Sequence, residues 1–582
     1  MENRLKRLSL VALGLFGLLA LRLAHLQLIQ GRRYARLSER NHIRRIVLPA
    51  PRGRIFDRGG RLLADSRPSF TVSVIPTELN DSTLTILSEL LDVTENDLSA
   101  VIQPLAFTSS PVAVRRNLDL TSVLRVEESQ FRLAGVRVSV DPIRRYPAGK
   151  SCCHAIGHLG EVTRTDLEHD TAYRLLDYIG RDGIEAQYEK LLRGQDGYEY
   201  IEVDARGHEI GTIAEKRPVQ PIPGHDLHLT IDLELQDLCL QLTSEYERCG
   251  IVGLNVRTGA VLCLVSKPVF DPAMFLSPIS GEEWTALNTG QAKPFFNRVT
   301  CAGYPPGSVL KPLVALAALR CGAAQSHTRF LPCHGSYQYG NRVFNCWSRH
   351  GSLDLLGAIT NSCNVYFYQL GLALGLDSLC SFCSLMPLGR ATGIDLPAEN
   401  PGNIPSRAWL DSKYGAGRWT SGLLLNFAIG QGEILATPLQ LAKTYAAIAN
   451  NGVSPRPYLL AAIDSAGRRI HETRVCLDTI ELNRADLREV KLALERVVTY
   501  GTARAARLEK IAIAGKTGTA QNPGTDHAWF VGYAPADDPE VVFAVLVENA
   551  GHGGVVAAPI ASRLIQAYYR EAETETLDPS TP

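Results

Sequence analysis

The chain has 582 residues, with 60 lysines and arginines against 60 aspartates and glutamates, so its formal net charge at pH 7 is zero. This length exceeds a single hydrophobic core and predicts about three or four compact units. Because there is no basic excess, we exclude nucleic acid as the partner. Thirteen cysteines are too sparse and irregular for a disulfide scaffold, and most are expected to be buried small apolar residues.

Residues 1–45 predict a short N-terminal tail, a transmembrane anchor and an exit segment. Leu8–Leu21 is an uncharged apolar run, and the apolar pattern continues to Leu28, which makes a helix long enough to span a bilayer. No small-residue cleavage site follows, so we favour an uncleaved anchor over a signal peptide or a buried soluble helix. Basic residues flank both ends of the span and do not decide its orientation. They are Arg4, Lys6, Arg7, Arg32, Arg33, Arg36 and Arg40.

Residues 46–225 predict a mixed α/β segment without a catalytic constellation. Residues 51–64 are typical of two short strands around an Asp/Gly turn, and residues 70–75 alternate as a further strand. Gly180–Glu185 opens a helix that we expect to run to about Leu192.

Residues 226–575 are expected to form a second domain, with residues 576–582 as a tail. Pro218, Pro221 and Pro223 interrupt the chain before it. Its strand candidates are 249–257, 260–266, 511–519, 529–533 and 541–548, and 558–569 is a final helix. Five strands divided by a helical insertion predict an α+β fold, in which helices flank a five-stranded antiparallel sheet.

Gly303–Pro312 places Ser308 and Lys311 three residues apart where a turn meets a helix. Two prolines and a glycine forbid a helix before Ser308, and the apolar residues 312–319 continue as a buried helix. Residues at i and i+3 share a helix face, so the Lys311 amine can lie beside the Ser308 hydroxyl and activate it as a nucleophile. For this motif alone, the alternative is a helix N-cap serine with a solvated lysine.

Two further motifs favour the catalytic interpretation. Ser362-Cys363-Asn364 follows a short amphipathic run, and Lys516-Thr517-Gly518-Thr519 ends a strand-like segment. The order S-x-x-K, S-x-N and K-T-G is typical of penicillin-recognising serine enzymes, in which the three motifs line one cleft. Alone, the last motif would indicate only a lysine-ended strand before a glycine turn.

Additional segments carry a resemblance that covers nearly the whole chain. They are Arg52–Arg58, Gly180–Glu185, Leu229–Asp232, Ile429–Gly432 and Asp526–Phe530. Together with the three motifs, they make the chain resemble the class B penicillin-binding proteins, and the last two segments look more like the elongation type than the septal division type. The resemblance implies a single N-terminal transmembrane helix, an elongated pedestal domain of the dimerisation type and a penicillin-recognising transpeptidase domain. No glycosyltransferase domain is evident before residue 225, unlike in the bifunctional class A proteins.

This resemblance implies a serine-type peptidoglycan D,D-transpeptidase that serves cell-wall elongation and cell shape. Ser308 would attack the D-Ala-D-Ala carbonyl of a stem peptide, and the amine of a neighbouring strand would resolve the acyl-enzyme as a cross-link. β-Lactams would acylate the same serine. Lys311 would accept the serine proton, because burial beside a second cation such as Lys516 would lower its pKa. No cofactor is needed for this chemistry.

The resemblance also implies supporting roles. Ser362 and Asn364 would relay the proton to the departing amine and orient the substrate amide. Lys516–Thr519 would receive the substrate carboxylate and pair with the peptide along the strand edge. The backbone N–H groups of Ser308 and Thr519 would form the oxyanion hole.

Other functions fit parts of the pattern. A septal division transpeptidase has the same motifs, and a D,D-carboxypeptidase or β-lactamase would pass the acyl-enzyme to water. A non-catalytic β-lactam sensor would couple the domain to several spans, whereas one span is evident. In the family the usual partners are a polytopic glycan polymerase and other elongation-complex proteins, so scaffolding can coexist with catalysis. The catalytic reading implies a cytoplasmic N-terminus and a periplasmic catalytic domain at the inner membrane.

Four residues near the second motif predict a metal site. Cys333, Cys346, His350 and Cys363 follow the spacing C-x12-C-x3-H-x12-C, and three thiolates with one imidazole complete a tetrahedral structural zinc set. The resemblance adds that some elongation-type relatives carry zinc here, with carboxylates in place of Cys333 and Cys346. The alternatives are a disulfide between Cys333 and Cys346, which flank a predicted hairpin at Ser336–Phe344, or buried free thiols.

Overall fold

The computed structural model describes residues 2–31, 43–108, 110–170, 172–203, 209–212, 217–277, 279 and 281–575. The basic residues at 32–40 and the expected tail at 576–582 lie outside these ranges. The chain divides into two compact units. The first unit comprises Met1–Arg52, Ser66–Ile143 and Arg193–Gly224, and the second comprises Gly53–Asp65, Arg144–Leu192 and His225–Pro582.

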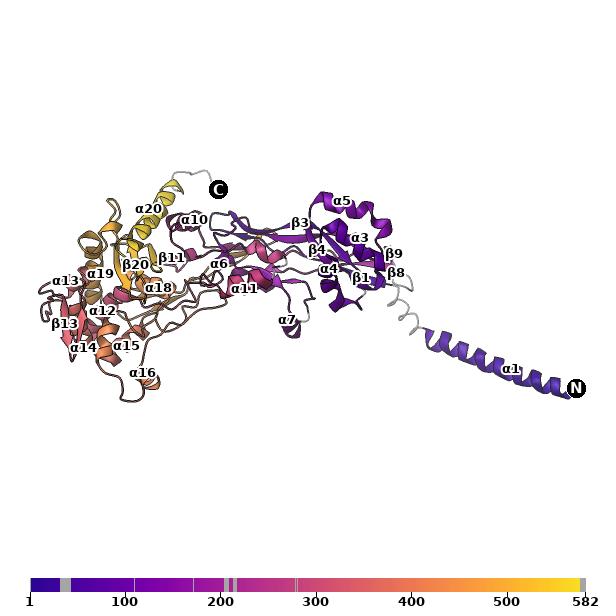
Figure 1. Ribbon diagram of the computed structural model, residues 1–582, viewed down its shortest axis with the longest axis horizontal. Coiled ribbons are helices and arrows are strands. Elements are labelled where there is room, and N and C mark those ends of the chain that lie inside the picture. The colour runs from indigo at the N-terminus through magenta and orange to yellow at the C-terminus, as the bar shows by residue number, and fades with distance from the viewer. Residues whose placement is uncertain are drawn as a thin grey trace. The chain divides into compact units, whose positions relative to one another are not determined.

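The first unit begins with helix α1 (Glu2–Ala24), drawn in indigo in Figure 1, which continues as the π-helical turn η1 (His25–Ile29). Within these helices, Leu8–Ile29 is long and apolar enough to cross a membrane, and none of that apolar stretch is buried. Such a stretch has no folded core to shield it from water. The helix therefore fits the anchor that the sequence predicts.

The rest of the first unit combines two groups of strands with short helices. Strand β8 (Gly197–Val203) pairs antiparallel with β1 (Ile43–Leu48) and with β9 (Glu209–Thr212), around a small core of Ile46, Ile201 and Val203. The later residues of β3 (Leu62–Val74) pair with β4 (Val112–Leu118), and β3 also pairs with β5 (Val136–Arg145). The helices are α3 (Asp81–Leu91), α4 (Glu95–Ile102) and α5 (Leu120–Glu128). Strand β3 is continuous from Leu62 to Val74, so the strand that we expected up to residue 64 and the strand that we expected at 70–75 are one element.

In the second unit, distant segments form a further sheet. Strand β10 (Asp226–Leu229) pairs in parallel with β2 (Ile55–Phe56) and antiparallel with β16 (Leu460–Ser465), which pairs with β17 (Arg468–Glu472). The first residues of β3 pair with β2. Short helices and strands lie between residues 153 and 192 of the second unit. They are α6 (Cys153–Ile156), β6 (Leu159–Glu161), α7 (Arg164–His169), β7 (Tyr178–Gly180), α8 (Gly183–Gln187) and α9 (Glu189–Leu192).

The helix expected from Gly180 to Leu192 is therefore wrong as one continuous element. It divides into α8 and α9 because Tyr188 leaves the helical region (φ −113°, ψ 27°). The Tyr188 hydroxyl donates to Asp395 at 2.9 Å. Within α8, Glu185 is fully buried, and its carboxylate accepts from Arg144 Nε at 2.7 Å.

The sheet of the second unit has five antiparallel strands in the order β12-β11-β21-β20-β19, which confirms the predicted α+β fold. Helices α10 (Leu233–Leu242) and α20 (Ala557–Glu575) contact each other and the sheet, and α18 (Pro438–Ala449) packs against its central strands (Figure 1). Because helices cover the sheet, every residue of β21 is buried. The strands are β11 (Cys249–Asn255), β12 (Val261–Lys267), β19 (Ala514–Ala520), β20 (His527–Ala534) and β21 (Val541–Val547).

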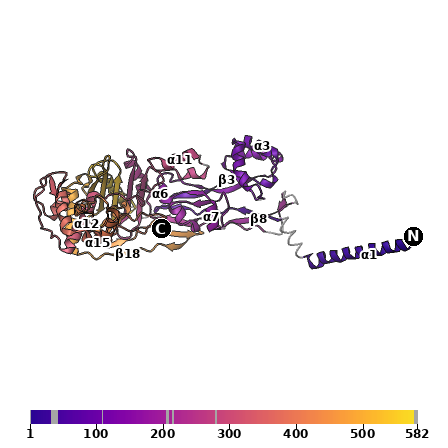
Figure 2. The same cartoon turned by 60° about the horizontal axis from the view of Figure 1, so that its bottom comes forward.

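A helical insertion separates β12 from β19. Figure 2 shows its helices α12 (Lys311–Cys321) and α15 (Leu376–Leu385) side by side. Strands β13 (Ser336–Tyr339) and β14 (Arg342–Asn345) form the predicted hairpin, which confirms it. The other helices are α11 (Gly281–Thr289), α13 (Leu355–Thr360), α14 (Asn364–Leu374), α16 (Arg407–Tyr414), α17 (Gly422–Ala428) and α19 (Arg484–Thr499), and a small ribbon joins β15 (Val453–Pro455) to β18 (Leu477–Thr479).

Candidate active site

Ser308 lies in a short 3-10 turn, Gly307–Leu310, that leads directly into α12. Gly307 has φ +56°, and a Cβ there would lie 2.8 Å from the backbone oxygen of Thr519. Only glycine fits this left-handed, crowded position. The Gly307 N–H donates to the oxygen of Gly430 at 2.8 Å. The serine turn therefore rests directly on the backbone of β19, and Ser308 itself is partly exposed.

Lys311 is fully buried and connects the first motif to the second. Its Nζ donates to the backbone oxygen of Ser362 at 2.8 Å, to the Ser362 hydroxyl at 3.2 Å and to Asn364 Oδ1 at 2.7 Å. Burial lowers the pKa of Lys311 from 10.5 to about 7, because a charged amine loses its hydration there. At neutral pH a substantial fraction of this amine is thus unprotonated and able to accept a proton.

The loop between α13 and α14 holds Ser362 in an unusual conformation. Its φ is +52°, a left-handed value that is costly for a residue with a side chain. Surrounding contacts maintain it, because the Ser362 N–H donates to Ile359 and the Cys363 N–H donates to Ala358. The strained geometry brings the Ser362 hydroxyl to Lys311.

The third motif lies on β19, the edge strand of the sheet. Lys516 is fully buried, and its pKa is lowered first by burial and then by the charge of Lys311. Thr517 shares a 2.6 Å hydrogen bond with the hydroxyl of Thr502. A Cβ at Gly518 would lie 3.0 Å from the oxygen of Pro306, so this strand also packs against the serine turn. All three predicted motifs therefore meet at one place.

Two contacts at this site involve residues to which the sequence reasoning gave no role. The Gln431 side chain donates to the backbone oxygen of Thr519 at 3.0 Å. The hydroxyl of the buried Tyr445 donates to the oxygen of Val309 at 2.8 Å. Gln431 lies in the segment Ile429–Gly432, whose resemblance to the elongation type was the available signal. Tyr445 gave no signal, because an aromatic residue inside an apolar helix is typical of any core.

The predicted metal ligands also come together. One donor atom from each of Cys333, Cys346, His350 and Cys363 lies within 4.8 Å of the others. The His350 Nδ1 faces the sulfurs of Cys333 at 3.6 Å and Cys346 at 3.5 Å. The pKa of the Cys346 thiol is lowered by its hydrogen bond with Cys363, and the pKa of Cys363 is raised by the same bond. A lowered thiol pKa favours the thiolate form that metal binding requires.

This cluster is attached to the second catalytic motif. Cys363 stands between Ser362 and Asn364, and the Asn364 N–H donates to the Cys346 sulfur at 3.3 Å. The Asn364 side chain also donates to the oxygen of Asn345, at the end of the β13–β14 hairpin, at 3.3 Å. Any interaction that holds the four ligands in place therefore also holds the loop of Ser362 and Asn364, which contacts Lys311.

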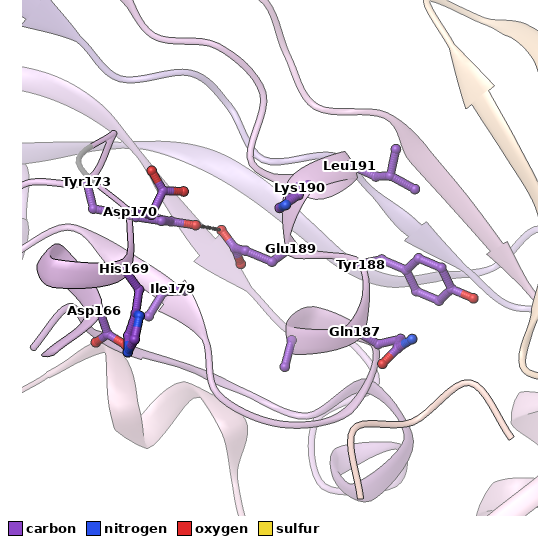
Figure 3. Close-up of a pocket in the computed structure, with 11 residues that line it drawn as sticks. Asp166, His169, Asp170, Tyr173, Ile179, Gln187, Tyr188, Glu189, Lys190 and Leu191 are labelled. Atoms are coloured by element: carbon purple, nitrogen blue, oxygen red, sulfur yellow. Dashed lines mark hydrogen bonds between the residues drawn. The ribbon is translucent and has the colours of Figure 1, made fainter. Parts of the chain in front are cut away.

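A cavity of about 400 Å³ lies elsewhere in the second unit, lined by residues from α7, β7, α8 and α9 (Figure 3). The dashed line in Figure 3 marks the hydrogen bond from Tyr173 to Glu189, at 2.9 Å. Other lining residues include Asp166, His169 and Asp170. None of the predicted site residues lines this cavity, so it is separate from the three motifs.

Comparisons with known proteins agree over most of the chain. Residues 249–566 match the family described as penicillin binding protein transpeptidase domain, and residues 47–229 match the penicillin-binding protein dimerisation domain. The chain is 34% identical to the peptidoglycan D,D-transpeptidase MrdA of Acinetobacter baumannii over 93% of this chain and 83% of that protein.

Solved structures are similar as well. A complex between penicillin-binding protein 2 (PBP2) and MreC from Helicobacter pylori matches with a TM-score of 0.79 at 28% identity, covering 90% of this chain and 100% of that chain. A peptidoglycan synthase complex, described as coordinating polymerization and crosslinking, matches with a TM-score of 0.71 at 30% identity, covering 97% of this chain and 98% of that chain.

Proposed function

Because the chain belongs to the class B penicillin-binding protein 2 family of peptidoglycan D,D-transpeptidases, we propose that it cross-links stem peptides through an acyl-enzyme on Ser308. The observation that carries this proposal is the buried Lys311 amine. It begins the helix that follows the Ser308 turn, it bonds Ser362 and Asn364, and its pKa of about 7 suits a general base.

Ser308 Oγ attacks the carbonyl carbon of the penultimate D-Ala and transfers its proton to Lys311 Nζ. The tetrahedral intermediate collapses, the peptide C–N bond breaks, and the terminal D-Ala leaves as an amine. Ser362 Oγ, which is 3.2 Å from Lys311 Nζ, relays the proton to that amine. An acceptor amine then attacks the ester, releases Ser308 and completes the cross-link. A β-lactam opens at the same step and leaves a stable ester.

In this proposal Lys516, Thr517 and Thr519 receive the substrate carboxylate and pair with the peptide at the edge of β19, and Gly518 is part of the same substrate-binding motif. Two backbone N–H groups, of Ser308 and Thr519, stabilise the oxyanion. Support comes from the contact of Gly307 with Thr519, which places the serine turn beside the strand. Such preorganised donors are worth about 10²–10³-fold in rate each.

Mass spectrometry of the purified protein after incubation with penicillin tests the nucleophile. We expect one covalent adduct on Ser308 and none in Ser308→Ala, whose fold should be unchanged because only a hydroxyl is removed. A D-Ala-D-Ala peptide with an acceptor amine should give the cross-linked product. Undiminished labelling of Ser308→Ala would contradict the assignment, and hydrolysis without amine transfer would indicate a carboxypeptidase.

We also propose that Cys333, Cys346, His350 and Cys363 hold a structural zinc ion. The donor set fits, since three sulfurs and one imidazole nitrogen complete tetrahedral zinc and one donor atom from each residue lies within 4.8 Å of the others. Bound zinc would supply structural cross-linking and no open catalytic position. The His350 Nδ1 is the ring nitrogen that faces the sulfurs of Cys333 and Cys346, so it is the atom placed to bind the ion.

Elemental analysis of the freshly purified protein should find one zinc per chain, absent from Cys346→Ser. Chelation should lower the melting temperature and slow acylation together, because the ligands hold the loop of Ser362 and Asn364. A protein without zinc, in which thiol titration shows two cysteines oxidised, would replace the metal by the Cys333–Cys346 disulfide.

The membrane arrangement and partners follow from the same family membership. We propose a single-pass protein of the inner membrane with a cytoplasmic N-terminus, a pedestal at 46–225 and a periplasmic transpeptidase domain at 226–575. By analogy with the PBP2–MreC complex and the peptidoglycan synthase complex, its partners are elongation-complex proteins and a glycan polymerase. Protease protection in spheroplasts tests the orientation: the catalytic domain should be degraded from outside.

A further inference from the structure

Gln431 joins the strand of the third motif to the turn that carries Ser308. Its side chain is buried, at 8% exposure, and Nε2 donates to the backbone oxygen of Thr519 at 3.0 Å. The preceding residue, Gly430, accepts the Gly307 N–H at 2.8 Å and has φ +72°. A Cβ at Gly430 would lie 2.1 Å from the oxygen of Gly307, so the two turns are in direct backbone contact.

These contacts determine the direction of the Thr519 backbone. On an antiparallel strand, the N–H and C=O of one residue point to the same side. A Cβ at Gly307 would lie 2.8 Å from the Thr519 oxygen and 3.4 Å from the Thr519 nitrogen, so both polar atoms lie next to the serine turn. The two groups belong to adjacent peptide planes, which the extended backbone of β19 couples, so a donor that holds the Thr519 carbonyl also constrains the direction of its N–H.

We propose that Gln431 is a positioning residue for transpeptidation, which aims the Thr519 N–H at the oxyanion that forms when Ser308 attacks. This inference rests on the proposed roles of Ser308 and Thr519. Gln431 touches none of the reacting atoms and acts through the backbone of Thr519. A carbonyl oxygen accepts two hydrogen bonds, so Thr519 can bond Gln431 and a substrate peptide together. A donor that is already oriented needs no rearrangement during the reaction.

Two variants of the full-length protein separate this role from packing. Gln431→Met keeps the length of the side chain and removes the donor. Gln431→Glu keeps its shape but presents a carboxylate at neutral pH, which regains a donor when it is protonated. In stopped-flow acylation by a β-lactam, both variants should lower the acylation rate constant about two- to tenfold at pH 8, the effect of one net hydrogen bond. The dissociation constant of the non-covalent β-lactam complex should change less than twofold.

Two further measurements report the oxyanion hole itself. The infrared band of the acyl-enzyme carbonyl should move to higher wavenumber in Gln431→Met, because a misdirected N–H polarises that carbonyl less. The acylation rate of Gln431→Glu, divided by that of the wild type, should rise toward one between pH 8 and pH 5. Gln236→Met is the matched control: Gln236 is fully buried and donates to Ser151 at 2.8 Å, on a helix that contacts the opposite edge strand, β12. It should lower stability only.

Unchanged acylation rate constants and band positions in both Gln431 variants, with only a lower melting temperature, would overturn the inference while labelling of Ser308 stands. If Gln431→Met fails to fold, the pH dependence of Gln431→Glu decides, and a ratio that stays constant with pH overturns the inference. A wild-type protein that penicillin does not label on Ser308 would overturn the proposed function and the inference with it.

Discussion

The rate of acylation should rise as Lys311 loses its proton. With a pKa of about 7, about half of the amine is neutral at pH 7. At its ordinary pKa of 10.5, only about 0.03% would be neutral, so burial increases the reactive fraction on the order of 10³-fold. The second-order rate constant for acylation by a chromogenic β-lactam should rise about tenfold per pH unit below pH 7 and level off above it.

One substitution should reverse part of this lowering of the Lys311 pKa. Asn364→Asp replaces an amide oxygen 2.7 Å from Lys311 Nζ by a carboxylate, which stabilises the ammonium form. An opposite charge this close should raise the pKa of Lys311 by about 1–3 units and move the midpoint of the pH–rate profile to between about 8 and 10. Asn255→Asp is the control, because it adds the same charge at the β11–β12 turn. A wild-type midpoint above about 9, or no shift in Asn364→Asp, would refute the assignment of Lys311 as the base.

Three further outcomes are expected. Gly430→Ala should slow acylation and cost well over ~1 kcal/mol of stability in chemical denaturation, because the new Cβ would meet the backbone of Gly307. The control Gly467→Ala, at a similar φ of +76° with nothing within 4 Å, should show only the cost of backbone strain. Glu185→Ala should cost roughly 3–5 kcal/mol because it leaves Arg144 buried and uncompensated, and Asp65→Ala, which breaks an exposed arginine pair, should cost at most about 1 kcal/mol. Depletion from the native cell should cause rounding under the microscope, and filaments with blocked septa would instead indicate a division enzyme.

The burial of Lys311 should also make the stability of the fold depend on pH. The lowered pKa means that protonation of Lys311 destabilises the folded state. This destabilisation is fully present below about pH 7 and disappears as the pH rises to 10.5. Spacing alone predicts that Lys311 lies near Ser308. The catalytic interpretation requires Lys311 to be buried, but the burial itself comes from helices packed around α12, and it lowers the pKa.

The sequence by itself determined the chemistry-bearing residues and the elements that carry them. Apolar periodicity predicted the five strands, the buried helix after Ser308 and the membrane-length helix, because each pattern repeats within a short stretch of chain. The metal-ligand spacing predicted four residues that the structure gathers within 4.8 Å. These features depend on local preferences and residue chemistry, which can be read without the fold.

The tertiary structure decided everything that joins distant segments. Pairing of β10 with β2 brings residues 53–65 into the second unit, and no local pattern encodes a partner so far away in sequence. The contact of Gln431 with Thr519 joins residues 88 positions apart. In the sequence, Gly307 and Gly430 resemble ordinary turn glycines. The folded structure shows that their backbones are in contact. Close approach of this kind depends on the packing of whole helices against the sheet, and only the folded chain determines it.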